Sequence, residues 1–162
     1  MQEIVNIRID ERLIHGQVAT VWTHTVGASR IIVIDDDVVR DDLQKQLLKM
    51  ACPSGIKLSI LSVAKAAENL CANKYDSERV FIVVKTPETL LALWDAGFNF
   101  LSVNVGNMSG RENTKQLKKA VCVTEQNIST LKELSRRGVR LWAQMVPSDE
   151  VQDIVKLMEA VL

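Results

Sequence analysis

The stretch Glu3–Trp22, EIVNIRIDERLIHGQVATVW, joins a strand pattern to a helix pattern through a short polar loop. Apolar residues recur in Glu3–Ile9, which predicts a strand, and the spacing of apolar residues predicts a helix over Gly16–Val26. His15 falls on the loop between them, where backbone N–H groups and the helix dipole favour an anion. Arg12 lies three residues earlier and brings a planar group of donors suited to phosphate oxygens. The pattern favours a histidine that carries a phosphoryl group.

Short β-branched runs alternate with longer stretches of helical spacing along the rest of the chain. Arg30–Ile34 and Arg79–Val84 are continuously apolar after their first residue, as expected of strands covered on both faces. This alternation predicts a three-layer α/β/α fold with a doubly wound, mostly parallel sheet of six to seven strands. Ligands of such folds bind beyond the carboxyl ends of the strands. The predicted strands are Glu3–Ile9, Arg30–Ile34, Lys57–Leu61, Arg79–Val84, Phe100–Val105, Ala120–Val123 and Val139–Gln144. The predicted helices are Gly16–Val26, Val39–Ala51, Val63–Cys71, Pro87–Ala96, Glu125–Arg136 and Ser148–Val161.

Residue types at the predicted helix ends support several of these boundaries. Thr86 before Pro87 predicts a capped helix start with proline at its first position. Ser148, followed by two acidic residues, predicts the start of the last helix in the same way. Gly27 and Gly138 fall where helices are expected to stop.

Length and composition limit the class of protein. A chain of 162 residues is expected to form one domain. Its 20 basic and 20 acidic side chains cancel, so no overall field draws it onto nucleic acid. Cys52, Cys71 and Cys122 form no closely spaced pair, which favours a reducing compartment in which they fill apolar space. No basic leader and no membrane-length apolar run is present in the sequence, so we expect a cytoplasmic protein.

The residues alone leave two interpretations of His15 open. As a phosphoryl carrier, its ring would attack phosphorus in the neutral form, which a helix start favours; as a structural residue, it would cap the helix or lie in the core. Asp10 can hold Arg12 in place or accept a hydrogen bond from the histidine ring. His24, nine residues further along the same predicted helix, is expected to face the opposite way as an ordinary exposed residue.

Polar residues also follow three other predicted strands. Asp35–Asp37 can bind a cation or cap the next helix, and we favour the cap and predict no metal. Lys85 and Thr86 can contact phosphate, or can simply end a strand and cap a helix. Gly106 lets the backbone approach a ligand. No phosphate-binding glycine loop follows any predicted strand, so ATP and dinucleotide cofactors are not expected.

Arg8–Val18, RIDERLIHGQV, resembles the signature of the enzyme IIB component of the mannose/sorbose family of sugar phosphotransferase systems. The likeness continues in Lys85–Pro87, in Val103–Met108 and in two stretches near the C-terminus, Gly138–Val139 and Gln144–Pro147. It spans essentially the whole chain, so the resemblance implies one IIB domain over residues 1–162.

The resemblance implies a phosphotransferase that needs no metal or nucleotide cofactor. A phosphorylated IIA protein, carrying phosphate on Nε2 of its histidine, would transfer it to Nδ1 of His15, and the membrane components IIC and IID would then receive it for the incoming sugar. The protein would be cytoplasmic and only transiently associated with the membrane. Asp10 and Arg12 match the active loop of the family. Phosphate or partner contacts are predicted at Gly16, Gln17, Lys85, Thr86 and Gly106.

Two further expectations concern recognition. One surface around the first strand-to-helix loop is expected to meet both IIA and the membrane partner, with local steering by Arg8, Arg12 and Lys85. The sugar is expected to belong to the mannose family. Asn104–Met108 resembles the N-acetylgalactosamine branch slightly more than the mannose branch, whose members tend to carry a second glycine at the position of Asn107.

Two rival functions remain open. A histidine-dependent phosphatase would hydrolyse its phosphohistidine, but such enzymes typically place arginine directly before the histidine, where this chain has Ile14, and they need a second histidine. A non-catalytic, flavodoxin-like ligand-binding domain would share the fold without the reaction.

Overall fold

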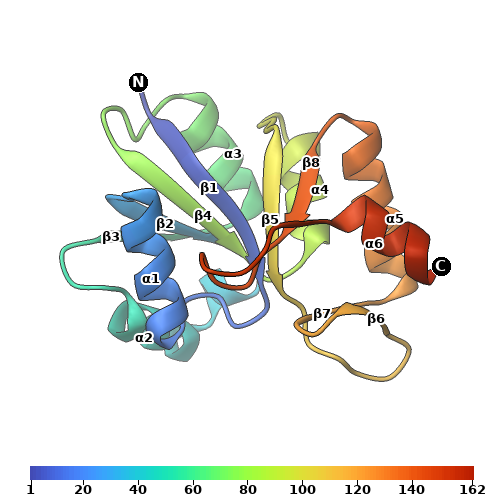
Figure 1. Ribbon diagram of the computed structural model, residues 1–162. Coiled ribbons are helices and arrows are strands. Elements are labelled where there is room, and N and C mark those ends of the chain that lie inside the picture. The colour runs from blue at the N-terminus through green and yellow to red at the C-terminus, as the bar shows by residue number, and fades with distance from the viewer.

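A seven-stranded sheet in the order β3-β2-β4-β1-β5-β8-β9 forms the centre of the molecule, with β9 its one antiparallel strand (Figure 1). The computed structural model describes residues 1–162, apart from the side chains of Gln17 and Val18. The strands are β1 Glu3–Asp10, β2 Arg30–Ile34, β3 Lys57–Leu61, β4 Arg79–Val84, β5 Ser102–Asn107, β6 Lys115–Lys118, β7 Val121–Val123, β8 Arg140–Ala143 and β9 Gln152–Asp153. The helices are α1 Gly16–Val26, the 3-10 turn η1 Val38–Arg40, α2 Asp42–Ala51, α3 Val63–Cys71, α4 Pro87–Asp95, α5 Glu125–Arg136 and α6 Ile154–Val161.

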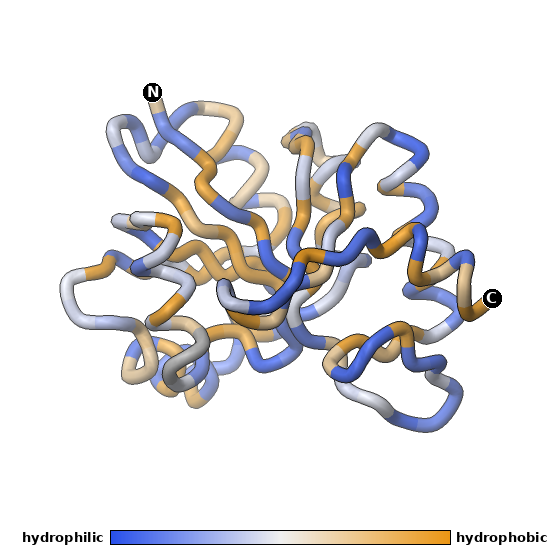
Figure 2. The backbone as a smooth tube through the Cα atoms, in the orientation of Figure 1, coloured by the Kyte–Doolittle hydropathy of each residue, from blue (hydrophilic) through white to orange (hydrophobic). Residues whose placement is uncertain are grey.

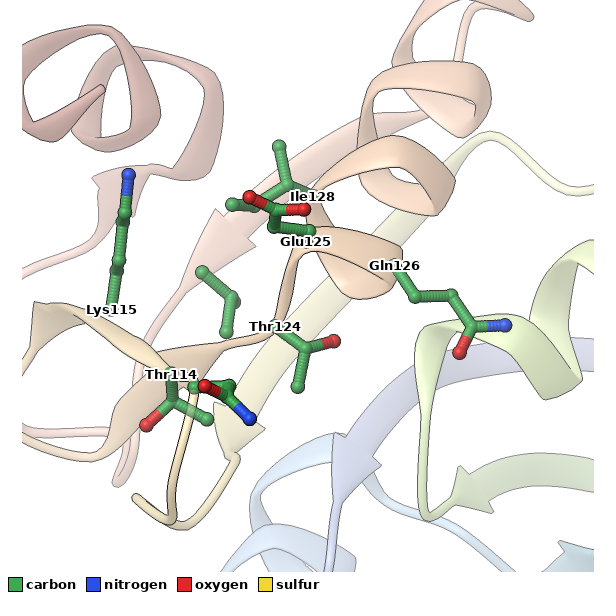
Figure 3. Close-up of a pocket in the computed structure, with 8 residues that line it drawn as sticks. Thr114, Lys115, Thr124, Glu125, Gln126 and Ile128 are labelled. Atoms are coloured by element: carbon green, nitrogen blue, oxygen red, sulfur yellow. The ribbon is translucent and has the colours of Figure 1, made fainter.

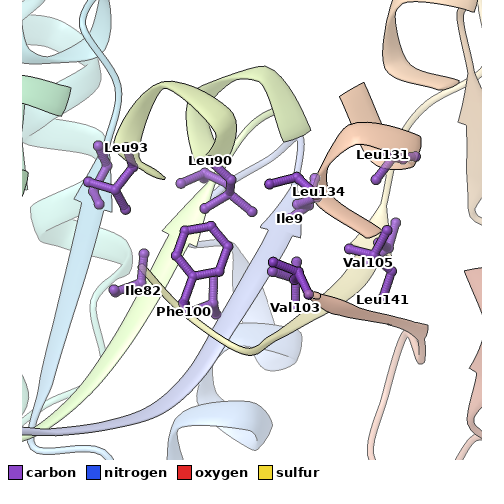
Figure 4. Packing of buried hydrophobic residues seen from close by; sticks show 14 of the residues in the cluster. Ile9, Ile82, Leu90, Leu93, Phe100, Val103, Val105, Leu131, Leu134 and Leu141 are labelled. Atoms are coloured by element: carbon purple, nitrogen blue, oxygen red, sulfur yellow. The ribbon is translucent and has the colours of Figure 1, made fainter. Parts of the chain in front are cut away.

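Helices cover the sheet on both faces, as the strand–helix alternation predicts. One face packs against α3, α4, α5 and α6 in the larger core cluster, which Figure 4 shows around Leu90, Phe100 and Leu131. The other face packs against α1, η1 and α2 through a smaller cluster that includes Trp22 and Leu48. The central strands are correspondingly apolar along the tube in Figure 2. The predicted three-layer architecture is confirmed.

The connections from β1 and β5 leave in opposite directions. β1 continues through α1 to β2 on one side, and the chain runs from β5 through α5 to β8 on the other. In doubly wound sheets such a reversal opens a crevice at the carboxyl ends of the two strands, where ligands bind. The loop that carries His15 starts at this point.

The predicted helix Val39–Ala51 is wrong at its start. Asp41 has an extended backbone, with φ −109° and ψ 100°, and its side chain accepts a hydrogen bond from the Gln44 N–H at 3.1 Å. The chain therefore forms the short turn η1 first, and α2 begins at Asp42 with Asp41 as its N-cap.

The C-terminal boundaries also differ from the prediction. Ser148 does not cap a helix, because residues 152–153 first pair with β8 as strand β9. Asp153 then caps α6 by accepting from the N–H groups of Val155 and Lys156. The strand predicted over Ala120–Val123 lies outside the main sheet, in a hairpin of β6 and β7.

The three cysteines do not share the buried state that we predicted. Cys71 is exposed, and Cys52 and Cys122 are half-buried. Among the described residues, no helix has the length and apolar character needed to cross a bilayer.

Candidate functional site

Two buried apolar residues fix the loop between β1 and α1. The Leu13 N–H donates to the Asp10 carbonyl at 2.9 Å, and Leu13 adopts a left-handed backbone with φ 58°. Leu13 and Ile14 both lie in the smaller core cluster and are less than a tenth exposed. Burial of this pair holds the left-handed turn and presents the next residue, His15, at the rim of the sheet.

His15 occupies the N-cap position of α1 through its backbone alone. It is extended, with φ −150° and ψ 136°, and its carbonyl accepts from the Ala19 N–H at 3.3 Å. Its ring makes no capping hydrogen bond. The ring Nε2 is enclosed and has no hydrogen-bond partner among the described residues. The ring is therefore not used to cap the helix, and the half-buried side chain keeps its chemistry available.

Burial lowers the pKa of His15 below its ordinary value of 6.5. The positive charges of Arg12 and Arg8 lower it further, and the negative charge of Asp10 opposes them. All the lowering contributions disfavour the imidazolium form. The lowered pKa therefore favours the neutral ring at neutral pH. The neutral ring has a free lone pair on one nitrogen and is the form able to attack phosphorus.

We expect His15 to titrate below pH 6.5, so that it stays neutral at a pH where a free imidazole is half protonated. Arg12→Ala removes one of the charges that lower this pKa, so the midpoint should rise. The measurement is an NMR titration of the His15 ring protons. Arg111→Ala removes an exposed arginine that does not contribute to the shift, and should leave the midpoint in place. A His15 midpoint above 6.5 in the unchanged protein would show that burial and the two arginines do not govern its protonation.

Asp10 is a buried carboxylate, 1% exposed, shared between two arginines. Its Oδ1 accepts from the Arg12 N–H at 3.0 Å and lies 3.5 Å from Arg12 Nε. Its Oδ2 accepts from Arg8 Nε at 3.4 Å and from Nη2 at 3.3 Å. Asp10 thereby holds Arg12, whose side chain is 40% exposed, beside His15.

Arg8 connects Asp10 to a distant segment of the chain. Its Nη1 donates to the Gln144 carbonyl at 3.0 Å, and its Nη2 donates to the Met145 carbonyl at 2.9 Å. The Trp22 indole N–H donates to the same Met145 carbonyl at 2.8 Å, and Arg8 Cζ lies 5.2 Å from the centre of the Trp22 ring. Because Arg8 is only 2% exposed, our prediction that it steers partners is wrong.

Gly106 lies against the same guanidinium. A Cβ at this position would stand 2.1 Å from Arg8 Cζ, closer than any non-bonded carbon pair tolerates. A glycine is needed at position 106 because the Arg8 side chain occupies the space that a Cβ would fill. Its predicted contact with phosphate remains a prediction.

Lys85 and Thr86 directly follow β4. Lys85 Nζ lies 3.4 Å from Gln44 Oε1 on α2, and the Thr86 hydroxyl caps α4 by accepting from the Thr89 N–H at 3.4 Å. Burial would raise the pKa of Glu11, but hydrogen bonds from Ser109 and the charges of Arg111 and Lys85 bring it below its ordinary value. Lys85 thus acts electrostatically on the histidine loop, whereas Thr86 is used as a cap.

The remaining sequence candidates fall in three groups. Gly16 opens α1 with a left-handed φ of 46°, and the side chain of Gln17 lies outside the described residues. His24 is exposed on α1, as predicted. Asp35 accepts from the N–H groups of residues 37 and 38, and Asp36 accepts from the N–H of residue 63. No group of three or more metal-ligating side chains occurs in the described part of the chain.

Sequence reasoning missed the buried role of Arg8 and the contacts of Glu11. Glu11 accepts from the Ser109 N–H at 2.7 Å and pairs with Arg111 at 2.7 Å, which ties the loop after β5 to the histidine loop. A signal for Arg8 was present, because residues two apart on a strand share a face. Arg8 and Asp10 therefore had to lie on the same side of β1.

One cleft of the structure lies away from His15. It measures about 530 Å³ and is formed between the β6–β7 hairpin and the start of α5 (Figure 3). Thr114, Lys115 and Thr124 line it, and no residue of the loop 10–16 does. His15 is therefore not part of this cleft.

Comparison with known proteins gives one consistent family. Residues 4–161 match the family of PTS system sorbose subfamily IIB components. The chain is 37% identical to the PTS system fructose-specific EIIB component of Bacillus subtilis over 99% of both chains. It is 39% identical to the PTS system sorbose-specific EIIB component of Klebsiella pneumoniae over 94% of this chain and 93% of the relative.

Solved structures agree with this result. The IIB domain of the sorbose permease from Klebsiella pneumoniae superposes with a TM-score of 0.94 at 37% identity, covering 99% of this chain and 98% of the other. The N-acetylgalactosamine-specific IIB component 1 from Escherichia coli superposes with a TM-score of 0.88 at 34% identity, covering 93% of this chain and 99% of the other. With fold, length and sequence in agreement, the chain belongs to the sorbose-subfamily IIB components of the sugar phosphotransferase system, which are phosphotransferases.

Proposed function

We propose that the chain is a phosphocarrier that accepts a phosphoryl group on Nδ1 of His15 from a phosphorylated IIA protein. It then passes the group to a sugar that enters through the membrane components IIC and IID. One observation carries this proposal: the ring of His15 makes no capping hydrogen bond and lies on the same loop as Arg12. Asp10 holds Arg12 in place.

The proposed reaction is a double displacement at phosphorus. The lone pair of neutral Nδ1 attacks phosphorus on the donor histidine, the new N–P bond forms, and the donor nitrogen keeps the electron pair of the bond that breaks. In the second step a sugar hydroxyl oxygen attacks phosphorus and gives up its proton to solvent, while the N–P bond at His15 breaks and its electron pair returns to Nδ1. Catalysis of such transfers rests on positioning and on neutralising charge. Arg12 and the N–H groups at the start of α1 supply that charge.

The enclosure of Nε2 supports the choice of ring nitrogen. A partner bearing phosphate must bring phosphorus within bonding distance of the attacking nitrogen, and Nε2 is buried inside the loop. Nδ1 is the nitrogen left for the reaction.

Arg12→Ala should slow phosphoryl transfer by roughly 10²–10³-fold, because removing one preorganised donor to a developing negative charge costs about 3–4 kcal/mol at a transition state. The melting temperature should hardly change, since the side chain is 40% exposed. Rates of transfer from phosphorylated IIA, followed by rapid quench, provide the measurement. Transfer at the unchanged rate would remove Arg12 from the mechanism.

We further propose that residues 1–162 act as one IIB domain in the cytoplasm and meet the membrane only through IIC and IID. The sugar is proposed to belong to the mannose family. Relatives named for fructose, sorbose, mannose and N-acetylgalactosamine are 37%, 39%, 38% and 35% identical to this chain. These identities do not favour N-acetylgalactosamine, so the slight preference of Asn104–Met108 for that branch stays a prediction.

Reconstitution tests the proposed function against its rivals. The protein is mixed with phosphoenolpyruvate, the general phosphotransferase proteins and a IIA protein, and its intact mass is followed with time. We expect a stable gain of one phosphoryl group that is lost in acid and kept in base. Steady release of inorganic phosphate would identify a phosphatase, and no gain of mass would favour a ligand-binding domain.

A further inference from the structure

Helix α2 carries apolar side chains on two sides. Leu48 is buried in the core cluster beneath the helix, as amphipathic packing requires. Leu43, Leu47 and Met50 point away from it and are 66%, 54% and 82% exposed. These three positions follow the i, i+4, i+7 spacing of one helix face. We call them the α2 stripe.

Single exposed apolar side chains are common on soluble proteins, whereas a contiguous group marks a contact surface. Among the described residues the other large exposed apolar side chains are the terminal Met1, Val161 and Leu162 and the separate Val21, Leu101 and Val151. The α2 stripe is the one group of three on a single helix within that part of the chain. None of its three residues belongs to either core cluster.

The helix that carries the α2 stripe packs in the same core cluster as the histidine loop. Leu48 and Val38 pack in the same core cluster as Leu13 and Ile14 of that loop, and Gln44 on the first turn of α2 lies 3.4 Å from Lys85. Leu48 of α2 also shares that cluster with Ala19 of α1. These contacts place α2 near the histidine loop, so an interface of ordinary size around His15 extends toward α2.

We propose that the α2 stripe is the apolar part of the surface on which the phosphorylated IIA protein docks, an inference that rests on the proposed function. A specific interface covers about 800 Å² on each partner, a patch roughly 30 Å across, and α2 spans about 15 Å. Because the chain carries 20 basic and 20 acidic side chains, steering by overall charge is weak. Apolar contact must then supply much of the affinity.

A steric argument and one comparison favour IIA over a second copy of this chain. A copy bound on the α2 stripe, close to the histidine loop, would compete with the phosphoryl donor for access to His15. Among the relatives, the PTS system mannose-specific EIIAB component of Escherichia coli is 38% identical, and the chain covers 48% of that protein's length. The name EIIAB says that this relative contains both a IIA and a IIB component. In that protein the two components are therefore parts of one chain.

The test is the double variant Leu43→Ser/Leu47→Ser, assayed for phosphoryl transfer from phosphorylated IIA. We expect the IIA concentration at half-maximal rate to rise roughly tenfold, with an unchanged rate at saturation and an unchanged pKa of His15. Leu101→Ser is the matched control: it replaces a leucine that is even more exposed, 81%, and that precedes β5 at the opposite end of the sheet. It should behave as the unchanged protein.

The outcomes separate this proposal from the proposed function. If the unchanged protein accepts no phosphate, the proposed function fails. If it does and the double variant has the same half-maximal concentration, the docking proposal is overturned. It is also overturned if the unchanged protein is a dimer that the variant dissociates, or if only transfer to the sugar through IIC and IID is weakened. Unaltered amide hydrogen exchange in the double variant serves as the check that it folds.

Discussion

Arg8→Met is expected to lower the free energy of unfolding by about 3–5 kcal/mol, because breaking a buried ion pair leaves a buried charge without its partner. Asp10 is 1% exposed and, of the two arginines that pair with it, would keep Arg12. The carbonyl of Gln144 would also lose its donor. Urea unfolding followed by circular dichroism gives the measurement. Arg12→Met is the control, since that side chain is 40% exposed and should cost less than about 1 kcal/mol.

Gly106→Ala provides an independent check on the same arrangement. It removes no charge, yet its Cβ would lie 2.1 Å from Arg8 Cζ and would force the guanidinium to move. Overpacking of this kind costs about 1–3 kcal/mol. If both Arg8→Met and Gly106→Ala leave stability within about 0.5 kcal/mol of the unchanged protein, Arg8 does not anchor the loop.

His15→Ala is expected to abolish phosphorylation altogether, while His24→Ala leaves it intact. His24 is exposed on α1 and serves as the matched histidine. The His15 ring makes no capping hydrogen bond, so its loss should change the melting temperature little. The measurement is intact-mass detection of the phosphoryl group together with thermal unfolding. Normal labelling of the His15→Ala protein would place the acceptor elsewhere.

The parts of the site that sequence could predict are the local ones. His15 and Arg12 share one short loop, and the apolar patterns on either side of it fix a strand and a helix. Thr86 before Pro87 is a local cap signal, and the structure uses it as one. Patterns of this range require no knowledge of distant residues.

The parts that were missed depend on contacts between distant segments. Arg8 is buried because the carbonyls of Gln144 and Met145 arrive from the far end of the chain. Gly106 is a glycine for the same reason, since Arg8 fills the space beside it. The start of the last helix shifted from Ser148 to Ile154 because residues 152–153 pair with β8 before the helix begins. In each case a tertiary contact overrode or completed a local signal.

The central claim is that phosphorus becomes bonded to Nδ1 of His15. It is tested most directly by phosphorylating the ¹⁵N-labelled protein from phosphoenolpyruvate through IIA and recording the ring nitrogen spectrum with its coupling to phosphorus. We predict that Nδ1 of His15 acquires the phosphorus coupling, while Nε2 of His15 and the ring of His24 do not. Phosphorus coupling at Nε2, at His24 or at no ring nitrogen would contradict it.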